Sequence, residues 1–293
     1  MKGIILAGGL GTRLYPLTAM LSKQLLPIYD KPMIYYPLSV LMYSGIREIL
    51  IITTPQHINL YKSLLDDGKQ LGIKIKYKVQ NEPRGLADAF ILGEEFIGND
   101  SVCMMLGDNL LYGDGLLEIL TKSKKEVENN KNSVIYGYYV NKPEDYGVIN
   151  FDSENNIISI EEKPKNPKSN YAAIGLYMYP NDVVKKAKLV KPSERGEIEI
   201  TSLNNIYLNE KRLKVIPLGR GYSWLDTGTN ESLVEASNLI MSIEQRSGLK
   251  VGCIEEIALQ NNFISPEEFL RIINKLKDCT YKSYLKRILK TYN

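Results

Sequence analysis

Three glycines and an arginine follow an apolar run near the start of the chain, in a pattern that could bind a phosphate. The segment GIILAGGLGTR, from Gly3 to Arg13, predicts a buried strand that enters a glycine-rich loop. Residues without a Cβ let backbone N–H groups converge on an anion, and a helix after the loop would add its positive dipole end. Lys23 could bind the same phosphates. The spacing matches neither a P-loop nor a dinucleotide fingerprint, so at this point a turn that binds nothing stays open.

A longer segment, GGLGTRLYPLTAMLSKQLLPIYDKPMIYYPL from Gly8 to Leu38, favours the phosphate-binding interpretation. It resembles the signature of the sugar-phosphate nucleotidyltransferases, in which a G-x-G-T-R loop is followed by a Pro, a Lys and a Lys-Pro-Met. The resemblance covers most of the chain and is closest to the short-form glucose-1-phosphate thymidylyltransferases. It implies that glucose 1-phosphate attacks the α-phosphorus of dTTP, giving dTDP-glucose and pyrophosphate for deoxysugar (dTDP-rhamnose type) and surface polysaccharide synthesis.

This reaction needs charge neutralisation more than it needs a general base. A phosphate monoester has its second pKa near ~6, so the nucleophile is already an anion at neutral pH. Cations and a divalent metal must then bring two anions together. By the resemblance, Arg13, Lys23 and Lys163 are the catalytic residues, with Lys163 bridging the attacking phosphate and the α-phosphate. Asp108 in GDN and Asp226 in WLDTGT would hold Mg²⁺, which prefers a few hard oxygen ligands.

The resemblance also assigns binding residues for each substrate. Those for the nucleotide are Leu6, Gly8, Gly9, Gly11, Thr12, Arg13, Gln24, Gln80 and Gly85; those for the sugar phosphate are Asn109, Tyr146, Gly147, Glu162, Lys163, Ala173, Gly175 and Arg195. A glutamine amide offers the donor and the acceptor that a pyrimidine 2,4-dione requires. The segment QNEPRGLADAF differs from the usual family sequence at Glu82, Arg84 and Asp88. The sequence therefore leaves open which bases and sugars the protein accepts.

Three other functions compete with this one. An enzyme of the same class could use UTP or another hexose phosphate. A catalytically silent nucleotide-sugar sensor is disfavoured, because it should have lost at least one of Arg13, Lys23, Asp108, Lys163 and Asp226. A dinucleotide oxidoreductase is excluded, because no acidic ribose reader follows the loop at the expected offset. The single histidine, His57, is expected to be structural, and Trp224 is expected to anchor the loop at Asp226 by packing.

Composition gives the class of protein and no global partner. The chain has 293 residues, 44% of them hydrophobic, which is enough for a large α/β domain. The net charge is +3, so neither nucleic acid nor a membrane is an expected partner. The cysteines at 103, 253 and 279 are odd in number and far apart, which is typical of reduced thiols in a cytoplasmic protein.

Apolar runs and helical patterns alternate through the first half of the chain. Strands are expected at 3–7, 48–53, 75–80 and 102–106, and helices at 37–44, 58–71 and 86–96. This alternation predicts a doubly wound, mostly parallel (mixed) α/β sheet with ligands at the carboxyl ends of its strands. After residue 133, alternating strand patterns predict an antiparallel sugar-binding extension. We expect one nucleotidyltransferase domain over 1–247, with a nucleotide half at 1–133 and a sugar-binding half at 134–247.

The last segment, 248–293, is expected to be helical. Ser265, Pro266 and Glu268 make a capping box with proline at the first helical position, and two amphipathic helices follow. Their apolar faces come after a core that looks complete from the sequence, so they are expected to contact another subunit. The resemblance implies a homotetramer, a dimer of dimers, with the end product dTDP-rhamnose as an inhibitor at a second site. Packing of these helices on their own subunit is the alternative.

Overall fold

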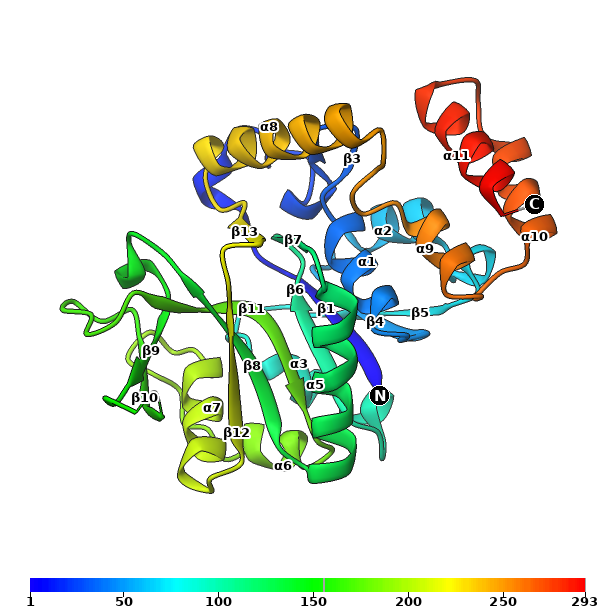
Figure 1. Cartoon of the computed structure of the whole chain (residues 1–293). Coiled ribbons are helices and arrows are strands. Elements are labelled where there is room, and N and C mark those ends of the chain that lie inside the picture. The colour runs from blue at the N-terminus through cyan, green and yellow to red at the C-terminus, as the bar shows by residue number, and fades with distance from the viewer. Residues whose placement is uncertain (155, 293) are drawn as a thin grey trace.

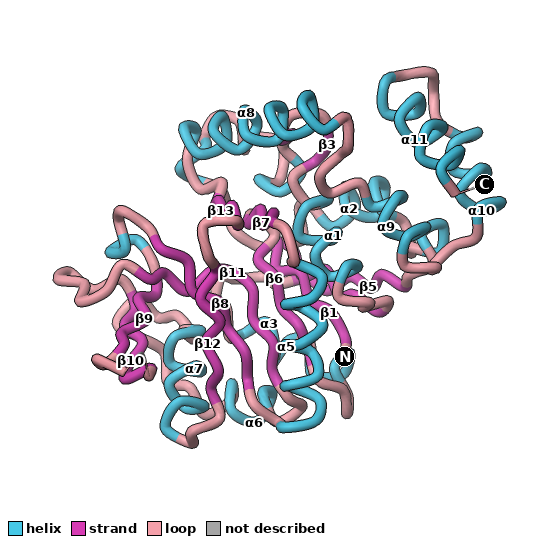
Figure 2. Tube along the Cα trace, in the orientation of Figure 1, coloured by secondary structure: helices cyan, strands magenta, loops and turns pink. Residues whose placement is uncertain are grey.

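Runs of aliphatic residues form the central strands of the protein. In the computed structural model, which describes residues 1–154 and 156–292, nine strands make one mixed sheet (Figures 1 and 2). They are β1 (Lys2–Ala7), β4 (Glu48–Thr53), β5 (Lys74–Val79), β6 (Val102–Leu106), β8 (Ser133–Tyr139), β9 (Gly147–Phe151), β10 (Ile157–Glu162), β11 (Tyr171–Tyr179) and β12 (Leu213–Leu218). The main order is β10-β9-β11-β6-β1-β4-β5, and β8 joins β12 to β11.

The direction of the strands confirms the predicted fold class. Strand β1 is parallel to β4 and β6, and β4 is parallel to β5. Strands β8 to β11 pair antiparallel, as expected, whereas β12 is parallel to β8. Two short ribbons lie outside the sheet: β7 (Asn109–Gly113) with β13 (Tyr222–Asp226), and β2 (Pro27–Ile28) with β3 (Lys31–Pro32).

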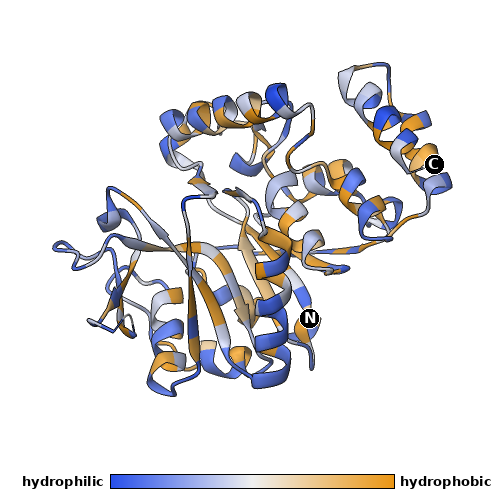
Figure 3. Cartoon of the chain, in the orientation of Figure 1, coloured by the Kyte–Doolittle hydropathy of each residue, from blue (hydrophilic) through white to orange (hydrophobic). Residues whose placement is uncertain are grey.

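Helices cover both faces of the sheet. They are α1 (Tyr35–Tyr43), α2 (Ile58–Leu65), α3 (Asp88–Leu92), α4 (Glu94–Ile97), α5 (Leu116–Asn130), α6 (Val183–Ala187), α7 (Ile200–Asn209), α8 (Asn230–Ser247), α9 (Ile254–Gln260), α10 (Pro266–Lys275) and α11 (Thr280–Thr291). Successive residues of β1 point to opposite faces, so Ile5 packs with α1, α2 and α5 while Ile4 packs with α3, α6 and α7. Figure 3 shows the hydrophobic strands between helices with hydrophilic outer faces.

Two of the predicted helices are broken. The helix expected over 58–71 ends at Leu65, because Asp66 and Gly68 have φ of 50° and 81°, and only a 3-10 turn, Lys69–Leu71, follows. The helix expected over 86–96 divides at Gly93 into α3 and α4. The long helix α8 was not anticipated, although Thr229 and Ser232 form a capping box at its start.

The C-terminal helices pack on their own subunit. The capping box of Ser265 and Glu268 is confirmed at the start of α10. Much of the two apolar faces is covered within the subunit, because Phe269 and Ile273 of α10 and Leu285 of α11 are fully buried where α9, α10 and α11 meet, whereas Leu270 is exposed. Each such buried side chain stabilises the fold by about 1.5–3 kcal/mol. The core was therefore incomplete without this segment.

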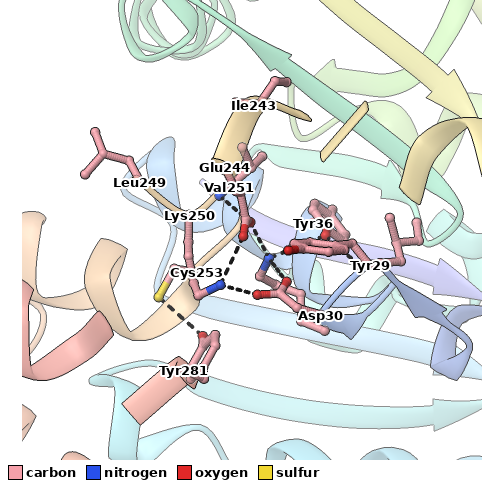
Figure 4. A network of polar contacts seen from close by, with 12 residues as sticks. Tyr29, Asp30, Tyr36, Ile243, Glu244, Leu249, Lys250, Val251, Cys253 and Tyr281 are labelled. Atoms are coloured by element: carbon pink, nitrogen blue, oxygen red, sulfur yellow. Dashed lines mark hydrogen bonds and ion pairs between the residues drawn. The ribbon is translucent and has the colours of Figure 1, made fainter. Parts of the chain in front are cut away.

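A buried ion cluster joins this segment to the β2–β3 ribbon. It consists of Asp30, Lys31, Glu244 and Lys250 (Figure 4). Lys31 Nζ donates to Asp30 Oδ1 at 2.5 Å and to Glu244 Oε1 at 2.8 Å, and Lys250 Nζ reaches both carboxylates from the other side. Two cations thus balance two carboxylates, and the Lys of the Lys-Pro-Met segment is a structural residue.

Two further expectations concern the surroundings of the sheet. Cys103, Cys253 and Cys279 are free thiols, as expected. His57 precedes α2 and its Nδ1 lies 2.9 Å from Thr54 Oγ1, which agrees with a structural role. Over the described residues, no helix is both long and apolar enough to cross a membrane.

Candidate active site

The glycine loop leaves the sheet after β1, at the carboxyl edge of the parallel strands. A Cβ on Gly8 would lie 2.8 Å from Gln80 Oε1, so the glycine makes room for that amide. Gly11 has φ of 62°, and its carbonyl accepts a hydrogen bond from Thr18 Oγ1 at 2.9 Å. After the loop only the 3-10 turn Thr12–Leu14 forms, so no long helix adds its dipole here. Tyr15 precedes a proline and adopts extended backbone, which ends the turn.

Arg13 is exposed and lies over the loop that follows β13. A Cβ on Gly228 would be 3.1 Å from Arg13 Nη2 and 3.3 Å from Asp226 Oδ2. The glycine at 228 therefore allows the guanidinium to approach the carboxylate of Asp226. This places the first predicted cation beside one of the predicted metal ligands, although the two are 213 residues apart in the sequence.

Lys23 is buried and forms an ion pair with the second predicted metal ligand. Its Nζ donates to Asp108 Oδ2 at 2.6 Å, and only 6% of Lys23 is exposed. The short 3-10 turn Lys23–Leu25 brings it there, close to Gly11. Loss of water around this pair strengthens its attraction, so Lys23 holds the Asp108 carboxylate in one position.

Asp108 and Asp226 face each other across the β7–β13 ribbon. In its register Asp226 is opposite Asn109, and Thr227 donates to the Asp108 carbonyl from both N, at 3.0 Å, and Oγ1, at 2.8 Å. Burial raises the pKa of Asp226, and the charge of Asp108 raises it further, against a hydrogen bond from Tyr146. An added cation would relieve this repulsion.

The donor set fits a magnesium ion that shares its coordination with a substrate. Within the described ranges, no group of three or more His, Cys, Asp or Glu side chains converges as a metal cluster. Two carboxylates alone leave most coordination positions to phosphate oxygens and water, which is how Mg²⁺ is usually held at phosphoryl-transfer sites. Asp226 Oδ1 accepts from Tyr146 at 3.0 Å, which fixes the orientation of this ligand.

Gln80 and Gln24 both lie near the edge of the sheet, but their side-chain amides are hydrogen-bonded differently. Gln80 follows β5, is 6% exposed, and donates from Nε2 to Asp88 Oδ2 at 3.0 Å. Gln24 is 3% exposed, and its Oε1 accepts from Ser22 Oγ at 2.8 Å and from Tyr61 at 3.2 Å. The oxygen of Gln24 is therefore already satisfied inside the protein.

A glycine is needed at position 85 because the backbone of Ile198 occupies the space that a side chain would take. Its φ is 99°, and a Cβ there would lie 2.5 Å from the Ile198 carbonyl oxygen. Ile198 N donates to the Arg84 carbonyl at 2.7 Å, and Ala87 N donates to the Ile198 carbonyl at 3.1 Å. The loop before α3 is thus joined to the loop that carries Arg195.

Three predicted sugar-binding residues, Gly147, Glu162 and Ala173, meet where β9 begins, β10 ends and β11 begins. Glu162 pairs in register with Gly147, and a Cβ on Gly147 would be 3.5 Å from Glu162 Oε2 and 3.9 Å from Ala173 Cβ. Thr201 Oγ1 donates to Glu162 Oε2 at 2.5 Å. Glu162 is half-buried with its second oxygen toward Arg195 Nη2 at 3.5 Å. The carboxylate is oriented by Thr201 and can still accept hydroxyl groups.

Asn109 and Gly175 touch each other and position the ribbon. A Cβ on Gly175 would be 2.6 Å from Asn109 Oδ1, which accepts from Gly175 N at 3.0 Å and from Trp224 Nε1 at 2.7 Å. Its Nδ2 donates to Asp108 Oδ1 at 3.1 Å. The packing role of Trp224 is confirmed, because it is buried edge-on against Tyr138 and Tyr146.

Lys163 and Arg195 lie on the sugar side but differ in their surroundings. Lys163 is exposed, and no acidic group in residues 1–154 or 156–292 makes an ion pair with it. Its φ of 44° is left-handed backbone immediately before Pro164. This conformation costs energy, and such residues are often found at functional sites. Arg195 instead donates to Glu199 Oε1 at 2.8 Å, with Glu197 Oε2 at 3.8 Å.

Sequence reasoning missed three residues that orient the predicted ones. They are Asp88 beside Gln80, Thr201 beside Glu162, and Thr227 beside Asp108. The sequence identifies Asp88 only as a difference from the usual family sequence, without a role. Thr227 lies within the segment WLDTGT and Thr201 lies six residues after Arg195, but a threonine has no pattern of its own that would distinguish it from its neighbours.

Comparison with known proteins gives a consistent result. The family model described as nucleotidyl transferase matches residues 2–243. A glucose-1-phosphate thymidylyltransferase of Neisseria meningitidis serogroup A is 51% identical over 99% of this chain and 100% of its own length, and one of Mycolicibacterium smegmatis is 50% identical over 99% of both chains.

Solved structures agree in fold over a shorter part of the chain. A Bacillus anthracis protein assigned to the glucose-1-phosphate thymidylyltransferases and solved with sucrose has a TM-score of 0.75 and 40% identity, covering 82% of this chain and 94% of that one. A UDP-glucose pyrophosphorylase solved with UDP-glucose has a TM-score of 0.71 and 28% identity, covering 83% and 98%. With the family model over most of the chain and full-length relatives at about half identity, the chain belongs to the nucleotidyl transferase family and, within it, to the glucose-1-phosphate thymidylyltransferases.

Proposed function

We propose that the protein transfers a thymidylyl group from dTTP to glucose 1-phosphate, giving dTDP-glucose and pyrophosphate. The observation that carries this proposal is the paired carboxylates Asp108 and Asp226 at the strand ends, with Lys23 bound to one and Arg13 beside the other. Gln80 lies beside Gly8 of the glycine loop, and Glu162 lies beside Gly147. The first would receive the nucleotide and the second the sugar phosphate, in the alignment that the transfer needs.

The cations of the chain supply the charge that the two anionic substrates need. Arg13 is assigned to the β- and γ-phosphates, which leave as pyrophosphate, and Lys23 to the triphosphate. Lys163, exposed and held in strained backbone, is assigned to the gap between the attacking phosphate and the α-phosphate. Preorganised charges of this kind stabilise charge that develops in the transition state. Arg195 is assigned to the sugar phosphate, and binding there would compete with its carboxylate partners.

A magnesium ion completes this proposal. Asp108 and Asp226 would hold it, and its charge would help to neutralise the phosphate oxygens during transfer. The raised pKa of Asp226 supports this assignment, because burial and the charge of Asp108 disfavour the ionised carboxylate, and an added cation would stabilise it. Tyr146 stays protonated, since burial raises its pKa, and it keeps donating to Asp226.

The test is pyrophosphate release measured with glucose 1-phosphate and each of dTTP, UTP, CTP and GTP, with Mg²⁺ and with a chelator. We expect the highest kcat/KM with dTTP and no turnover with the chelator. Lys163→Ala should lower kcat and raise the KM for glucose 1-phosphate. A clear preference for UTP would replace the proposed nucleotide, and equal activity in chelator would refute the metal site.

The proposal includes an assembly and a regulator that the resemblance implies. The protein would be a cytoplasmic homotetramer, inhibited by dTDP-rhamnose at a second site and serving O-antigen-type polysaccharide synthesis. Because the C-terminal helices are packed into the subunit core, their deletion would unfold the chain. The mass of the intact protein by light scattering, and inhibition by dTDP-rhamnose that added dTTP does not reverse, test both parts. A monomer, or purely competitive inhibition, would contradict them.

A further inference from the structure

Asp88 is a buried carboxylate to which the proposed reaction gives no role. It opens α3, is 1% exposed, and accepts from Gln80 Nε2 at 3.0 Å through Oδ2. Its other oxygen, Oδ1, has no hydrogen-bond partner in the part of the chain that the structure describes. Arg84 Nη1 lies 3.9 Å from it, on a side chain that is 59% exposed. Burying a carboxylate costs free energy unless hydrogen bonds compensate for the lost water. The hydrogen bond from Gln80 is therefore the main compensation that Asp88 has.

The chemistry of the pair fixes which way the Gln80 amide points. A carboxylate can only accept hydrogen bonds, so the NH₂ group of Gln80 must face Asp88 and the carbonyl must face away. The geometry agrees, because Gln80 Oε1 lies 2.8 Å from the position that a Cβ on Gly8 would take. The amide therefore presents an acceptor over the glycine loop, at the carboxyl ends of β1 and β5. A neutral partner at position 88 could donate as well as accept, and both amide orientations would then be possible.

We propose that Asp88 is a positioning residue that sets which bases Gln80 can pair with. This inference rests on the proposed function, in which Gln80 contacts the base of the nucleotide. With its carbonyl toward the cleft, Gln80 accepts from the N3–H of an imide base, which thymine and uracil share. Cytosine presents an N3 lone pair at that place, so two acceptors would face each other. Asp88 thus selects 2,4-dioxo pyrimidines against cytosine and does not separate thymine from uracil.

The experiment compares dTTP, dUTP and dCTP with wild type and with Asp88→Asn, as kcat/KM at fixed glucose 1-phosphate. Asp88→Asn should lower the dTTP to dCTP ratio about 10-fold, the size of one mispaired hydrogen bond, and leave the dTTP to dUTP ratio unchanged. Asp88→Glu keeps an acceptor-only carboxylate and should preserve the wild-type ratio. Glu82→Gln removes an exposed acid from the same loop and should change none of the three. If Asp88→Asn does not fold, Asp88→Ser provides the neutral side chain.

Two outcomes overturn the inference. One is an equal loss with all three nucleotides in the neutral variant, because a residue that only supports α3 would not distinguish bases. The other is a ratio in Asp88→Glu that falls as far as in Asp88→Asn. Calorimetric titration of the same proteins with dTTP and dCTP repeats the comparison without turnover. If wild type fails to turn over dTTP yet binds it in preference to dCTP, the proposed function fails while the role of Asp88 stands.

Discussion

The site at the strand ends and the buried ion cluster beneath α8 each bring two cations to two carboxylates, but the pKa of a carboxylate shifts in opposite directions in the two. Burial alone would raise the pKa of Asp30 in the buried ion cluster, yet hydrogen bonds from Lys250 and Lys31 outweigh it and the pKa is lowered. At the strand ends, burial raises the pKa of Asp226 and the charge of Asp108 raises it further, against Tyr146, Lys23 and Arg13. Ion pairs in the buried ion cluster therefore stabilise the contact between segments, whereas Asp226 would be stabilised further by an added cation.

The largest expected effect comes from replacing either carboxylate at the strand ends. Asp226→Asn and Asp108→Asn should each lower magnesium-dependent turnover by about 10³–10⁴-fold, because a bound metal contributes several kcal/mol of transition-state stabilisation. The thermal midpoint of Asp226→Asn without ligands should stay level or rise, since the variant removes a repelled charge. Steady-state kinetics and calorimetry measure the two effects. Near-normal activity at limiting Mg²⁺ would rule out the two-carboxylate site.

The next effect breaks the buried ion cluster. Lys31→Met should destabilise the protein by about 3–5 kcal/mol, because it removes a buried cation and leaves the buried Glu244 carboxylate with Lys250 alone. Its kcat at 25 °C should stay close to that of wild type while the protein is folded. Lys122→Met is the matched control, since Lys122 makes an exposed ion pair with Glu118 at 2.6 Å, and loss of a solvent-screened pair should scarcely change the stability. Equal denaturation midpoints for the two variants would show that the cluster is not structural.

Arg13→Ala tests whether a cation at the strand ends contributes to turnover without contributing to stability. Turnover with dTTP should fall by about 10²–10³-fold, equivalent to roughly 3 kcal/mol for one preorganised charge contact. Stability should not change, because Arg13 is exposed. Arg220→Ala, another exposed arginine, should leave both quantities unchanged. A near-native kcat in Arg13→Ala would remove this residue from the mechanism.

The smallest effect sharpens the comparison through pH. Burial raises the pKa of Glu255, although Tyr281 donates to it at 2.5 Å. The folded protein therefore binds a proton more readily than the unfolded chain, and this contribution to stability is lost as pH rises through the raised pKa. Glu255→Gln should raise the thermal midpoint at pH 7, with a smaller gain at pH 4. Glu244→Gln should instead lower the midpoint at pH 7, since it leaves lysines underbalanced. Scanning calorimetry at both pH values measures this, and gains for both variants would contradict the contrast.

The sequence predicted the local features of the fold better than its long-range contacts. The strands at 48–53 and 102–106 and the capping box at Ser265 were predicted from runs and spacings that are local. The breaks after Leu65 and at Gly93 were missed, because apolar periodicity continues across them while the backbone does not. The coverage of the C-terminal helices was missed because it depends on α1 and α9, which are some 215 residues apart.

The candidate site shows the same limit. Gly8, Lys23, Asp108 and Asp226 were found because they stand in a recognisable motif. Their roles toward one another were not visible, since the Lys23–Asp108 pair spans 85 residues and the Tyr146–Asp226 hydrogen bond spans 80. The sequence assigned Gly85 to the nucleotide, but it could not show that the absence of a Cβ there also makes room for the Ile198 backbone.

That contact between Gly85 and Ile198 bears on how nucleotide preference can be changed in the laboratory. Any side chain at position 85 would meet the Ile198 backbone within 2.5 Å, so randomising this position would fill a library with misfolded members. Randomising positions 80 and 88 instead alters side-chain hydrogen bonding and leaves the backbone bridge between the two loops unchanged. Screens for enzymes that make unnatural nucleotide sugars should therefore keep glycine at position 85 and vary the glutamine and its carboxylate partner together.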